Sequence, residues 1–279
     1  DATSNEKFDI IYHAGYQSAS LAILRFKNKS KAKWITNMDG LEWKRDKWSK
    51  PVKLLTKIME RIAVKYSDYI VSDNLGIQFY YDKNFNVKSK YLAYGAEIPE
   101  NVLEEYLTEY NLIIDNYYVL VARLEPENSI EIILDGYTKV NSAKPFLVIG
   151  KFATKYGSFL KSKYSDNENI KFLGGVYDKD KLDSLRKYSA IYFHGHTVGG
   201  TNPSLLEAMA LGCFIVHHNN GFNNSVIGNI SYAFKNYIDV TNIIVNHETY
   251  KLSDIEDLRS QNISIIKKEY SWNKIINEH

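Results

Sequence analysis

The sequence contains one cysteine, Cys213, among its 279 residues. A single cysteine excludes an internal disulfide framework and a metal site built from thiolates, and it favours a reducing compartment. Long apolar segments are lacking as well, since no run approaches the roughly 18 residues of a bilayer-spanning helix. Neither charge is in excess, because 35 basic and 33 acidic side chains leave a net charge of +2. So small a net charge does not predict a nucleic-acid partner.

Short runs rich in β-branched and aromatic residues alternate with helical patterns from residue 117 onward. Strands are expected at 117–123, 146–150, 170–174, 190–195 and 214–218, and helices near 128–140, 154–164, 179–188 and 203–211. This alternation predicts βαβ units around a parallel sheet. The strand runs are apolar throughout, as expected for strands covered on both faces. Residues 112–250 therefore predict one doubly wound α/β domain.

The first part of the chain has a similar but sparser pattern. Strands are expected at 8–15, 33–36, 68–73 and 89–94, and helices at 17–26, 51–66 and 75–82. We predict a second α/β domain over residues 1–98, with few strands for an independent sheet. Residues 95–110 suit a hinge between the domains, and residues 251–279 are expected to form helices.

Ligands of open α/β sheets bind beyond the carboxyl ends of the strands, so the residues after each predicted strand are candidates. Arg123 and Asn128 follow one strand, Gly174 ends another, and His196 lies after a third. Arg123 could form a salt bridge with an acid, but its place at a strand end favours a phosphate. Several histidines lie near this edge, yet no carboxylate stands at metal-ligand spacing. The set suits a phosphorylated ligand rich in hydroxyls better than a metal ion.

Residues 196–212 read HTVGGTNPSLLEAMALG. Thr201 or Asn202 can cap the helix that follows. The positive end of that helix attracts an anion, and Gly200 lets a diphosphate approach the backbone closely. Glu207, about one turn further on, is placed to accept hydrogen bonds from ribose hydroxyls. The spacing alone fits an ordinary capped helix with an exposed Glu207 equally well.

Residues 39–66 combine tryptophans with a basic, amphipathic helix. A stripe expected to face the core is formed by Val52, Leu55, Met59, Ile62 and Tyr66. A basic stripe beside it is formed by Lys50, Lys53, Lys57, Arg61 and Lys65. The basic stripe can be a solvated face of a core-packed helix, or it can rest on anionic lipid. Both interpretations can hold for different faces.

Several motifs lie in order along the chain: NMDGLEWKRDKWS (37–49), YGAEIPE (94–100), VARLEPEN (121–128), FLGGVYD (172–178) and HGHTVGGTNPSLLEAMALG (194–212). Together they resemble the bacterial GT-B glycosyltransferases of family 4. Within that family they look most like the branch that adds rhamnose during the assembly of capsule, O-antigen or cell-wall polysaccharide.

The resemblance implies two Rossmann-like domains, with the donor nucleotide sugar held by the second one across a cleft from the acceptor. It implies that Arg123 meets the donor diphosphate, that the backbone at Gly174 frames the base and that Glu207 binds the ribose. The candidates are Asp39, Arg123 and His196 for catalysis; Arg123, Asn128, Gly174, Gly200, Thr201, Asn202, Ser204 and Glu207 for the donor; and Lys44, Arg45, Lys47 and Trp48 for the acceptor and the membrane. The C-terminal helices, 251–279, are expected to cross back to the first domain.

The sequence departs from the pattern of the family at three places. Gly199 stands where most members carry a glutamate that contacts the donor sugar, and Asn128 stands where they carry a lysine. The rhamnose branch shows similar changes, which suit a deoxysugar. The first strand and glycine loop of the family should lie before residue 1, so we expect an incomplete acceptor domain.

These expectations converge on a retaining, metal-independent transfer of L-rhamnose from a dTDP- or UDP-linked sugar to a lipid-diphosphate-linked saccharide. No cofactor is expected, and the location implied is the cytoplasmic, inner face of the bacterial plasma membrane, with peripheral contact. The alternatives are a nucleotide-sugar epimerase or phosphorylase on the same fold, and a non-catalytic nucleotide-sugar-binding protein. A dinucleotide dehydrogenase is the weakest alternative, because no Gly-x-Gly-x-x-Gly motif follows a strand.

Overall fold

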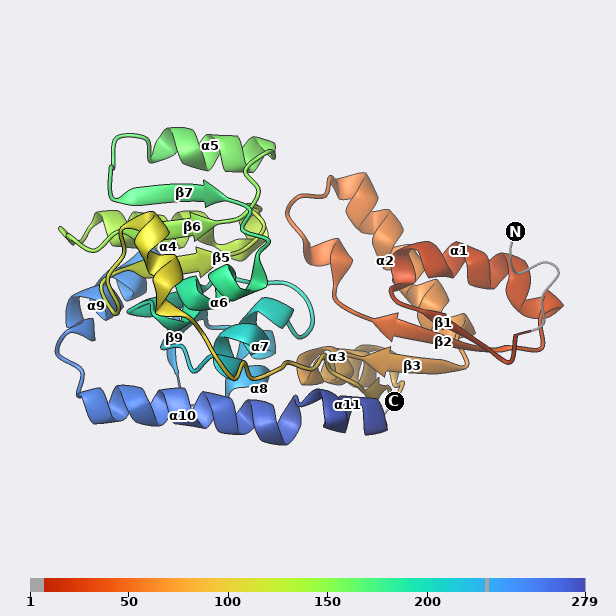
Figure 1. The fold of residues 1–279 in the computed structure, drawn as a ribbon. Coiled ribbons are helices and arrows are strands. Elements are labelled where there is room, and N and C mark those ends of the chain that lie inside the picture. The colour runs from red at the N-terminus through yellow and green to blue at the C-terminus, as the bar shows by residue number, and fades with distance from the viewer. Residues whose placement is uncertain (1–7, 229–230, 279) are drawn as a thin grey trace. The chain divides into compact units, whose positions relative to one another are not determined.

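The computed structural model describes residues 8–228 and 231–278 and divides into two compact units (Figure 1). Of the described residues, the first unit holds those up to Tyr94, with Val198–Thr201 and Glu278, and the second holds those within Gly95–Thr197 and Asn202–Asn277. Each unit is built on its own parallel sheet, so the predicted α/β class with two parallel-sheet domains is confirmed. Across the described ranges, none of the helices has the length and apolar character required to cross a bilayer.

The first unit contains a four-stranded sheet whose strands lie side by side in chain order. The strands are β1 (Ile10–His13), β2 (Lys33–Met38), β3 (Tyr69–Ser72) and β4 (Lys90–Tyr91). The connecting helices are α1 (Tyr16–Phe26), α2 (Lys50–Tyr66) and α3 (Leu75–Phe85), with short 3-10 turns at Lys27–Lys29 and Glu42–Lys44. All three strand pairs are parallel, so the few strands that the sequence predicted do form a sheet of their own.

Helix α2 turns a different face to the core from the one that its apolar stripe predicted. Its buried residues are Thr56, Glu60 and Ala63, whereas the side chain of Leu55 is 51% exposed. Glu60 accepts hydrogen bonds from the Trp43 indole and from the hydroxyls of Tyr80 and Tyr81. A buried carboxylate is tolerated where donors satisfy its oxygens, so this face packs inward. Of the predicted stripe, Val52, Met59 and Ile62 are half-buried, whereas the prediction is wrong for Leu55 and Tyr66, which are exposed.

The second unit contains a six-stranded parallel sheet in the order β10-β9-β8-β5-β6-β7. The strands are β5 (Tyr118–Val121), β6 (Phe146–Ile149), β7 (Ile170–Gly174), β8 (Ile191–His194), β9 (Ile215–His218) and β10 (Tyr232–Phe234). The chain runs outward from β5 through β6 to β7, and then returns to the other side of β5 with β8. The strand order therefore reverses between β5 and β8. In open α/β sheets, such a switch point is where ligands bind.

Helices connect these strands and pack on the sheet (Figure 1). The connecting helices are α4 (Ile130–Thr138), α5 (Lys155–Lys163), α6 (Lys179–Lys187), α7 (Pro203–Ala210) and α8 (Gly221–Ile227). Helices α9 (Tyr237–His247), α10 (Leu252–Glu269) and α11 (Trp272–Glu278) follow β10, and 3-10 turns lie at Glu104–Tyr110 and Pro126–Asn128. Every residue of β6 and of β8 is buried. Burial on both faces explains why these strands appear in the sequence as uninterrupted apolar runs.

Candidate functional site

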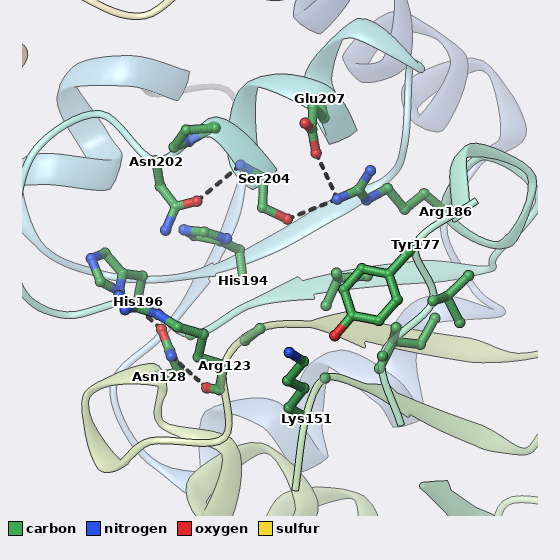
Figure 2. A pocket seen from close by; sticks show the side chains of 18 residues that line it. Arg123, Asn128, Lys151, Tyr177, Arg186, His194, His196, Asn202, Ser204 and Glu207 are labelled. Atoms are coloured by element: carbon green, nitrogen blue, oxygen red, sulfur yellow. Dashed lines mark hydrogen bonds and ion pairs between the residues drawn. The ribbon is translucent and has the colours of Figure 1, made fainter. Parts of the chain in front are cut away.

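A cavity of about 570 Å³ opens in the second unit at the carboxyl ends of β5, β6 and β8 (Figure 2). It lies at the switch point of the sheet, and the first turns of α7 form part of its wall. Six of the predicted site residues line it: Arg123, Asn128, His196, Asn202, Ser204 and Glu207. The structure therefore gathers predicted side chains from two separate segments of the chain, 123–128 and 196–207, into one concave site.

The N-terminus of α7 is capped by Asn202, whose side chain accepts a hydrogen bond of 2.9 Å from the Ser204 N–H. Pro203 occupies the first helical position and carries no N–H to satisfy. The Asn202 amide and the Ser204 hydroxyl both face the cavity in Figure 2. The dipole of α7 adds positive potential at this end, so the wall of the cavity favours an anion.

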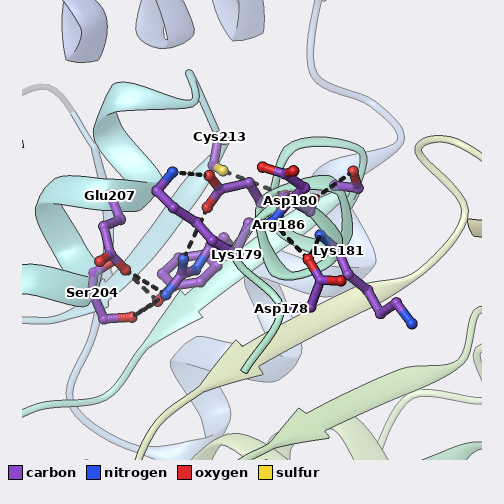
Figure 3. Close-up of polar contacts among 11 residues, drawn as sticks. Asp178, Lys179, Asp180, Lys181, Arg186, Ser204, Glu207 and Cys213 are labelled. Atoms are coloured by element: carbon purple, nitrogen blue, oxygen red, sulfur yellow. Dashed lines mark hydrogen bonds and ion pairs between the residues drawn. The ribbon is translucent and has the colours of Figure 1, made fainter. Parts of the chain in front are cut away.

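Glu207 is paired with a buried arginine rather than left as a lone surface acid. The Arg186 Nη2 atom lies 2.7 Å from Glu207 Oε2 and donates to the Ser204 hydroxyl over 3.1 Å (Figures 2 and 3). The Arg186 side chain is 4% exposed, while that of Glu207 is 44% exposed. The arginine therefore fixes the carboxylate in one position and leaves much of it open to the cavity.

Arg186 is a site residue that the sequence did not reveal. It lies in the last turn of α6 and also contacts Asp183, three residues earlier, at 3.3 Å. Figure 3 shows Arg186 between that turn and α7. An Asp–Arg pair three residues apart is common on exposed helices, so the spacing carries no signal of burial. Only the packing of α6 against α7 turns Arg186 inward.

Asn128 ties the loop after β5 to the loop after β8. Its amide donates to the Arg123 carbonyl oxygen at 2.7 Å, and its Oδ1 lies 2.9 Å from His196 Nδ1. Within the described part of the chain, no ion pair is recorded for the exposed guanidinium of Arg123, which disfavours the salt-bridge alternative. Arg123 is thus a cation at the cavity that can meet a ligand anion.

Three histidines near the cavity, His194, His217 and His218, are neutral at pH 7. Burial, and then the neighbouring His196, hold the pKa of His194 well below its ordinary value, and burial lowers the pKa of His217 and His218. Among residues 8–228 and 231–278, no group of three or more His, Cys, Asp or Glu side chains could hold a metal ion. These imidazoles can donate or accept hydrogen bonds without adding charge.

Three other predicted donor residues do not line the cavity. Gly174 ends β7 with a φ of 78°, and its neighbour Gly175 takes the place at the cavity wall. Gly200 and Thr201 cluster with the first unit rather than with the second. Their predicted roles in donor binding stay predictions.

The predicted catalytic residue Asp39 lies in the first unit, after β2, and Asp73 follows the neighbouring strand β3. Burial, with the nearby Glu42 second, raises the pKa of Asp39 to about 6. Burial, with Asp39 second, raises the pKa of Asp73 to about 8. In both side chains Oδ1 is buried and has no hydrogen-bond partner among the described residues. Asp73 is therefore protonated at neutral pH, and the two carboxyl groups can hold and release a proton.

The predicted acceptor residues follow β2 in the same unit. Glu42 pairs with Arg45 and accepts a hydrogen bond from the Trp48 indole, so the charge of Arg45 is already balanced. Lys44 and Lys47 are exposed and lie over tryptophan rings, at 5.4 Å from the Trp43 centroid and 4.8 Å from the Trp48 centroid. Of the predicted cations, Lys44 and Lys47 are the ones placed to meet an anion. Their role stays a prediction.

Comparison with known proteins agrees with this geometry. Residues 113–246 match the family model described as "Glycosyl transferases group 1", and residues 2–97 match a domain of unknown function, DUF1972. No protein of curated function matches the sequence.

Solved structures share the fold over nearly the whole chain. Anabaena HepE in complex with UDP-glucose is 14% identical, with 97% of this chain and 77% of that chain covered and a TM-score of 0.83. Sucrose-phosphate synthase from Thermosynechococcus elongatus is 13% identical, with 97% and 72% covered and a TM-score of 0.83. TarM is 15% identical, with 96% and 53% covered and a TM-score of 0.72. These solved structures show that the fold is GT-B, and the similarity to the group 1 glycosyl transferases covers the second unit of the chain.

Proposed function

We propose that this protein is a retaining, metal-independent glycosyltransferase. It moves a sugar, L-rhamnose as the favoured candidate, from a dTDP- or UDP-linked donor to a lipid-diphosphate-linked saccharide during the synthesis of a cell-surface polysaccharide. The observation that carries the proposal is the cavity at the switch point, where the start of α7, the cation Arg123 and the fixed carboxylate of Glu207 converge. A nucleoside diphosphosugar carries an anionic diphosphate and ribose hydroxyls. The cation and the helix start suit the diphosphate, and the carboxylate can accept hydrogen bonds from the hydroxyls.

The protein contributes mainly by stabilising the leaving nucleoside diphosphate. Negative charge grows on the diphosphate as its bond to the sugar C1 breaks, and Arg123 and the positive end of α7 oppose that charge. The acceptor hydroxyl attacks C1 from the face that the diphosphate leaves, so the configuration is retained. Its proton passes to the departing phosphate oxygen. Glu207 accepts hydrogen bonds from the ribose hydroxyls, and Arg186 keeps it in place.

His196 and Asp39 complete the proposed catalytic set. His196 lines the cavity and contacts Asn128, which positions its ring toward the sugar end of the donor. Asp39 lies at the carboxyl end of the first unit's sheet, and its raised pKa suits a group that exchanges a proton near neutral pH.

The choice of rhamnose depends on what stands at two positions of the sequence. Gly199 offers no carboxylate to a sugar hydroxyl, and Asn128 offers an amide where a lysine is common in the family that the sequence resembles. A 6-deoxysugar presents one hydroxyl fewer, so a site with fewer polar side chains suits it.

We propose that the first unit binds the membrane surface through helices α1 and α2. Helices α1 and α2 pack together and expose five large apolar side chains: Leu21, Leu24, Leu54, Leu55 and Ile58. Basic residues flank them on α2, and Lys44 and Lys47 lie just before that helix. Apolar side chains framed by cations favour an anionic bilayer surface, which supports a peripheral location at the inner face of the bacterial plasma membrane.

Product analysis tests this function. The purified protein is incubated with dTDP-rhamnose alone and with a lipid-diphosphate-linked saccharide, and the nucleotide and glycolipid products are separated. We expect dTDP release and a lengthened acceptor only when both substrates are present, and loss of both in Arg123→Ala. An altered sugar formed from the donor alone would instead identify an epimerase, and donor binding without any turnover would identify a non-catalytic binding protein.

A further inference from the structure

A second pocket, of about 720 Å³, lies in the second unit apart from the donor cavity. Its wall consists of the segment 96–100, Lys179 at the start of α6, Ile266 and Lys267 on α10, and residues 271–273 at the start of α11. Of the described residues, none lines both this pocket and the donor cavity. Pockets of about 300–1,000 Å³ hold small organic ligands, so this one is large enough for a ligand of that size.

The tryptophan of this pocket, Trp272, presents a flat aromatic surface that the fold holds in place. A Cβ atom on Gly95 would lie 2.6 Å from the indole Cδ2 and 3.1 Å from Cε2, the two atoms of the bond that the rings share. The Gly95 backbone therefore lies against the indole at a distance that leaves no room for a side chain. Trp272 nevertheless stays 43% exposed, so much of the indole is open to a ligand.

Two backbone contacts fasten the walls of the pocket together. The Ala96 N–H donates to the Tyr270 carbonyl oxygen over 2.8 Å, and Ala96 and Ser271 form a parallel β-bridge. The segment that carries Glu97 and Glu100 is thus fixed beside the start of α11. A wall that is formed before the ligand arrives costs little ordering entropy on binding.

The charged side chains of the pocket favour an uncharged ligand. Two carboxylates, Glu97 and Glu100, and two ammonium groups, Lys179 and Lys267, line the pocket, so their formal charges cancel. The Lys179 ammonium is already paired with Asp183. Within the described ranges, neither glutamate has a hydrogen-bond or ion-pair partner, so both carboxylates are available to accept hydrogen bonds from a ligand.

We propose that this pocket is a second saccharide-binding site, which takes a neutral oligosaccharide. Trp272 stacks on the C–H face of a pyranose ring, because those hydrogens are attracted to the negative face of an aromatic ring. Glu97 and Glu100 accept hydrogen bonds from the sugar hydroxyls, and the Asn273 amide can both donate and accept. A sugar joins an apolar ring face to many hydroxyls, which matches this set of side chains.

Saccharide binding at this pocket goes beyond the proposed function and does not depend on it. In an enzyme that lengthens a polysaccharide, such a site holds sugar units that lie away from the reacting end. A chain held at two sites has a higher effective concentration at the first, so it is released less often between transfers.

An array of immobilised neutral and uronic-acid-containing oligosaccharides, probed with the full chain, tests this site. Calorimetry then measures the affinity for the most strongly bound glycan in the wild type, Trp272→Ala, Trp272→Phe and the double variant Glu97→Ala/Glu100→Ala. Tyr237→Ala is the matched control, because Tyr237 is 44% exposed on α9 and does not line the pocket. Thermal melting checks that each variant is folded. If Trp272→Ala does not fold, the double variant decides, because both glutamates are exposed.

We expect the most strongly bound glycan to be neutral. Trp272→Ala should weaken its binding by about fivefold or more, because the stacking surface is lost. The double variant should weaken it by a similar factor, because two acceptors of hydroxyl hydrogen bonds are lost. Trp272→Phe keeps a flat ring and should lie between wild type and Trp272→Ala, and Tyr237→Ala should match the wild type. The affinity for UDP should be the same in all of them.

The inference is overturned, while the proposed function stands, if the wild type binds no neutral oligosaccharide on the array or prefers the acidic ones. Equal affinity of the wild type and the double variant for the bound glycan overturns it too, because the glycan would then bind elsewhere. A wild-type protein that binds the glycan in this pocket but binds no nucleotide sugar overturns the proposed function and leaves this site standing.

Discussion

Replacing Glu207 with alanine is expected to weaken the binding of UDP or dTDP by at least about tenfold, since hydrogen bonds to charged groups contribute ~1.5–3 kcal/mol. The carboxylate is 44% exposed and held by Arg186 at 2.7 Å, so it is fixed before the ligand arrives. A fixed acceptor costs little ordering entropy on binding, which makes its contribution large. Calorimetric titration of the nucleotide into wild type and variant measures the loss.

Two further variants test whether the loss of nucleotide affinity is specific to the Glu207 carboxylate. Glu207→Gln keeps the shape and one carbonyl oxygen, so its loss should lie between those of the wild type and Glu207→Ala. Glu256→Ala removes an exposed acid from helix α10 and should leave the affinity unchanged. Equal affinity of wild type and Glu207→Ala for every nucleotide tested would remove Glu207 from the site.

Replacing Arg186 with methionine is expected to lower the free energy of unfolding by about 3–5 kcal/mol, as breaking a buried ion pair does. The guanidinium is 4% exposed and contacts both Asp183, whose side chain is 6% exposed, and Glu207. Without it, the Asp183 carboxylate stays buried beside a lysine that is 62% exposed. Urea unfolding measures the loss, and donor affinity should fall as well because Glu207 is no longer held.

Arg259→Met provides the matched control for Arg186. Arg259 pairs with Asp115 at 2.9 Å, and the two side chains are 26% and 55% exposed. A pair this accessible to water contributes about 0–1 kcal/mol, so its loss should change unfolding little. The same decrease in both variants would show that Arg186 has no special structural role.

The alternation of strands and helices could be predicted from the sequence because each strand of the second unit is a short run of buried residues. Every residue of the run Phe146–Ile149 and of the run Ile191–His194 is buried, and apart from His194 these runs are apolar or aromatic, as expected for strands covered on both sides. Arg123 follows β5 and His196 follows the neighbouring strand β8, so both lie at the same edge of the sheet. Topology alone therefore brings the predicted donor residues together.

The orientation of single helix faces could not be predicted in the same way. Helix α2 presents an apolar stripe in its sequence, yet it buries Glu60. The reason is that Tyr80, Tyr81 and Trp43, all distant in the sequence, supply the donors. The burial of Arg186 could not be predicted from the sequence either, because it depends on contacts with Ser204 and Glu207 in the next βα unit. Periodicity records which residues share a face, but not which partners that face will meet.

The central claim is that the cavity of the second unit binds a nucleoside diphosphosugar. A thermal-shift screen of dTDP-, UDP- and GDP-linked sugars, with the free sugars as controls, tests it most directly. At about 100 times the dissociation constant a ligand adds ~2.7 kcal/mol, which corresponds to a rise in Tm of roughly 5–10 °C for a chain of this size. We predict such a rise with a dTDP- or UDP-linked sugar and none with the free sugars. An unchanged Tm with every nucleotide sugar in the screen would contradict the account.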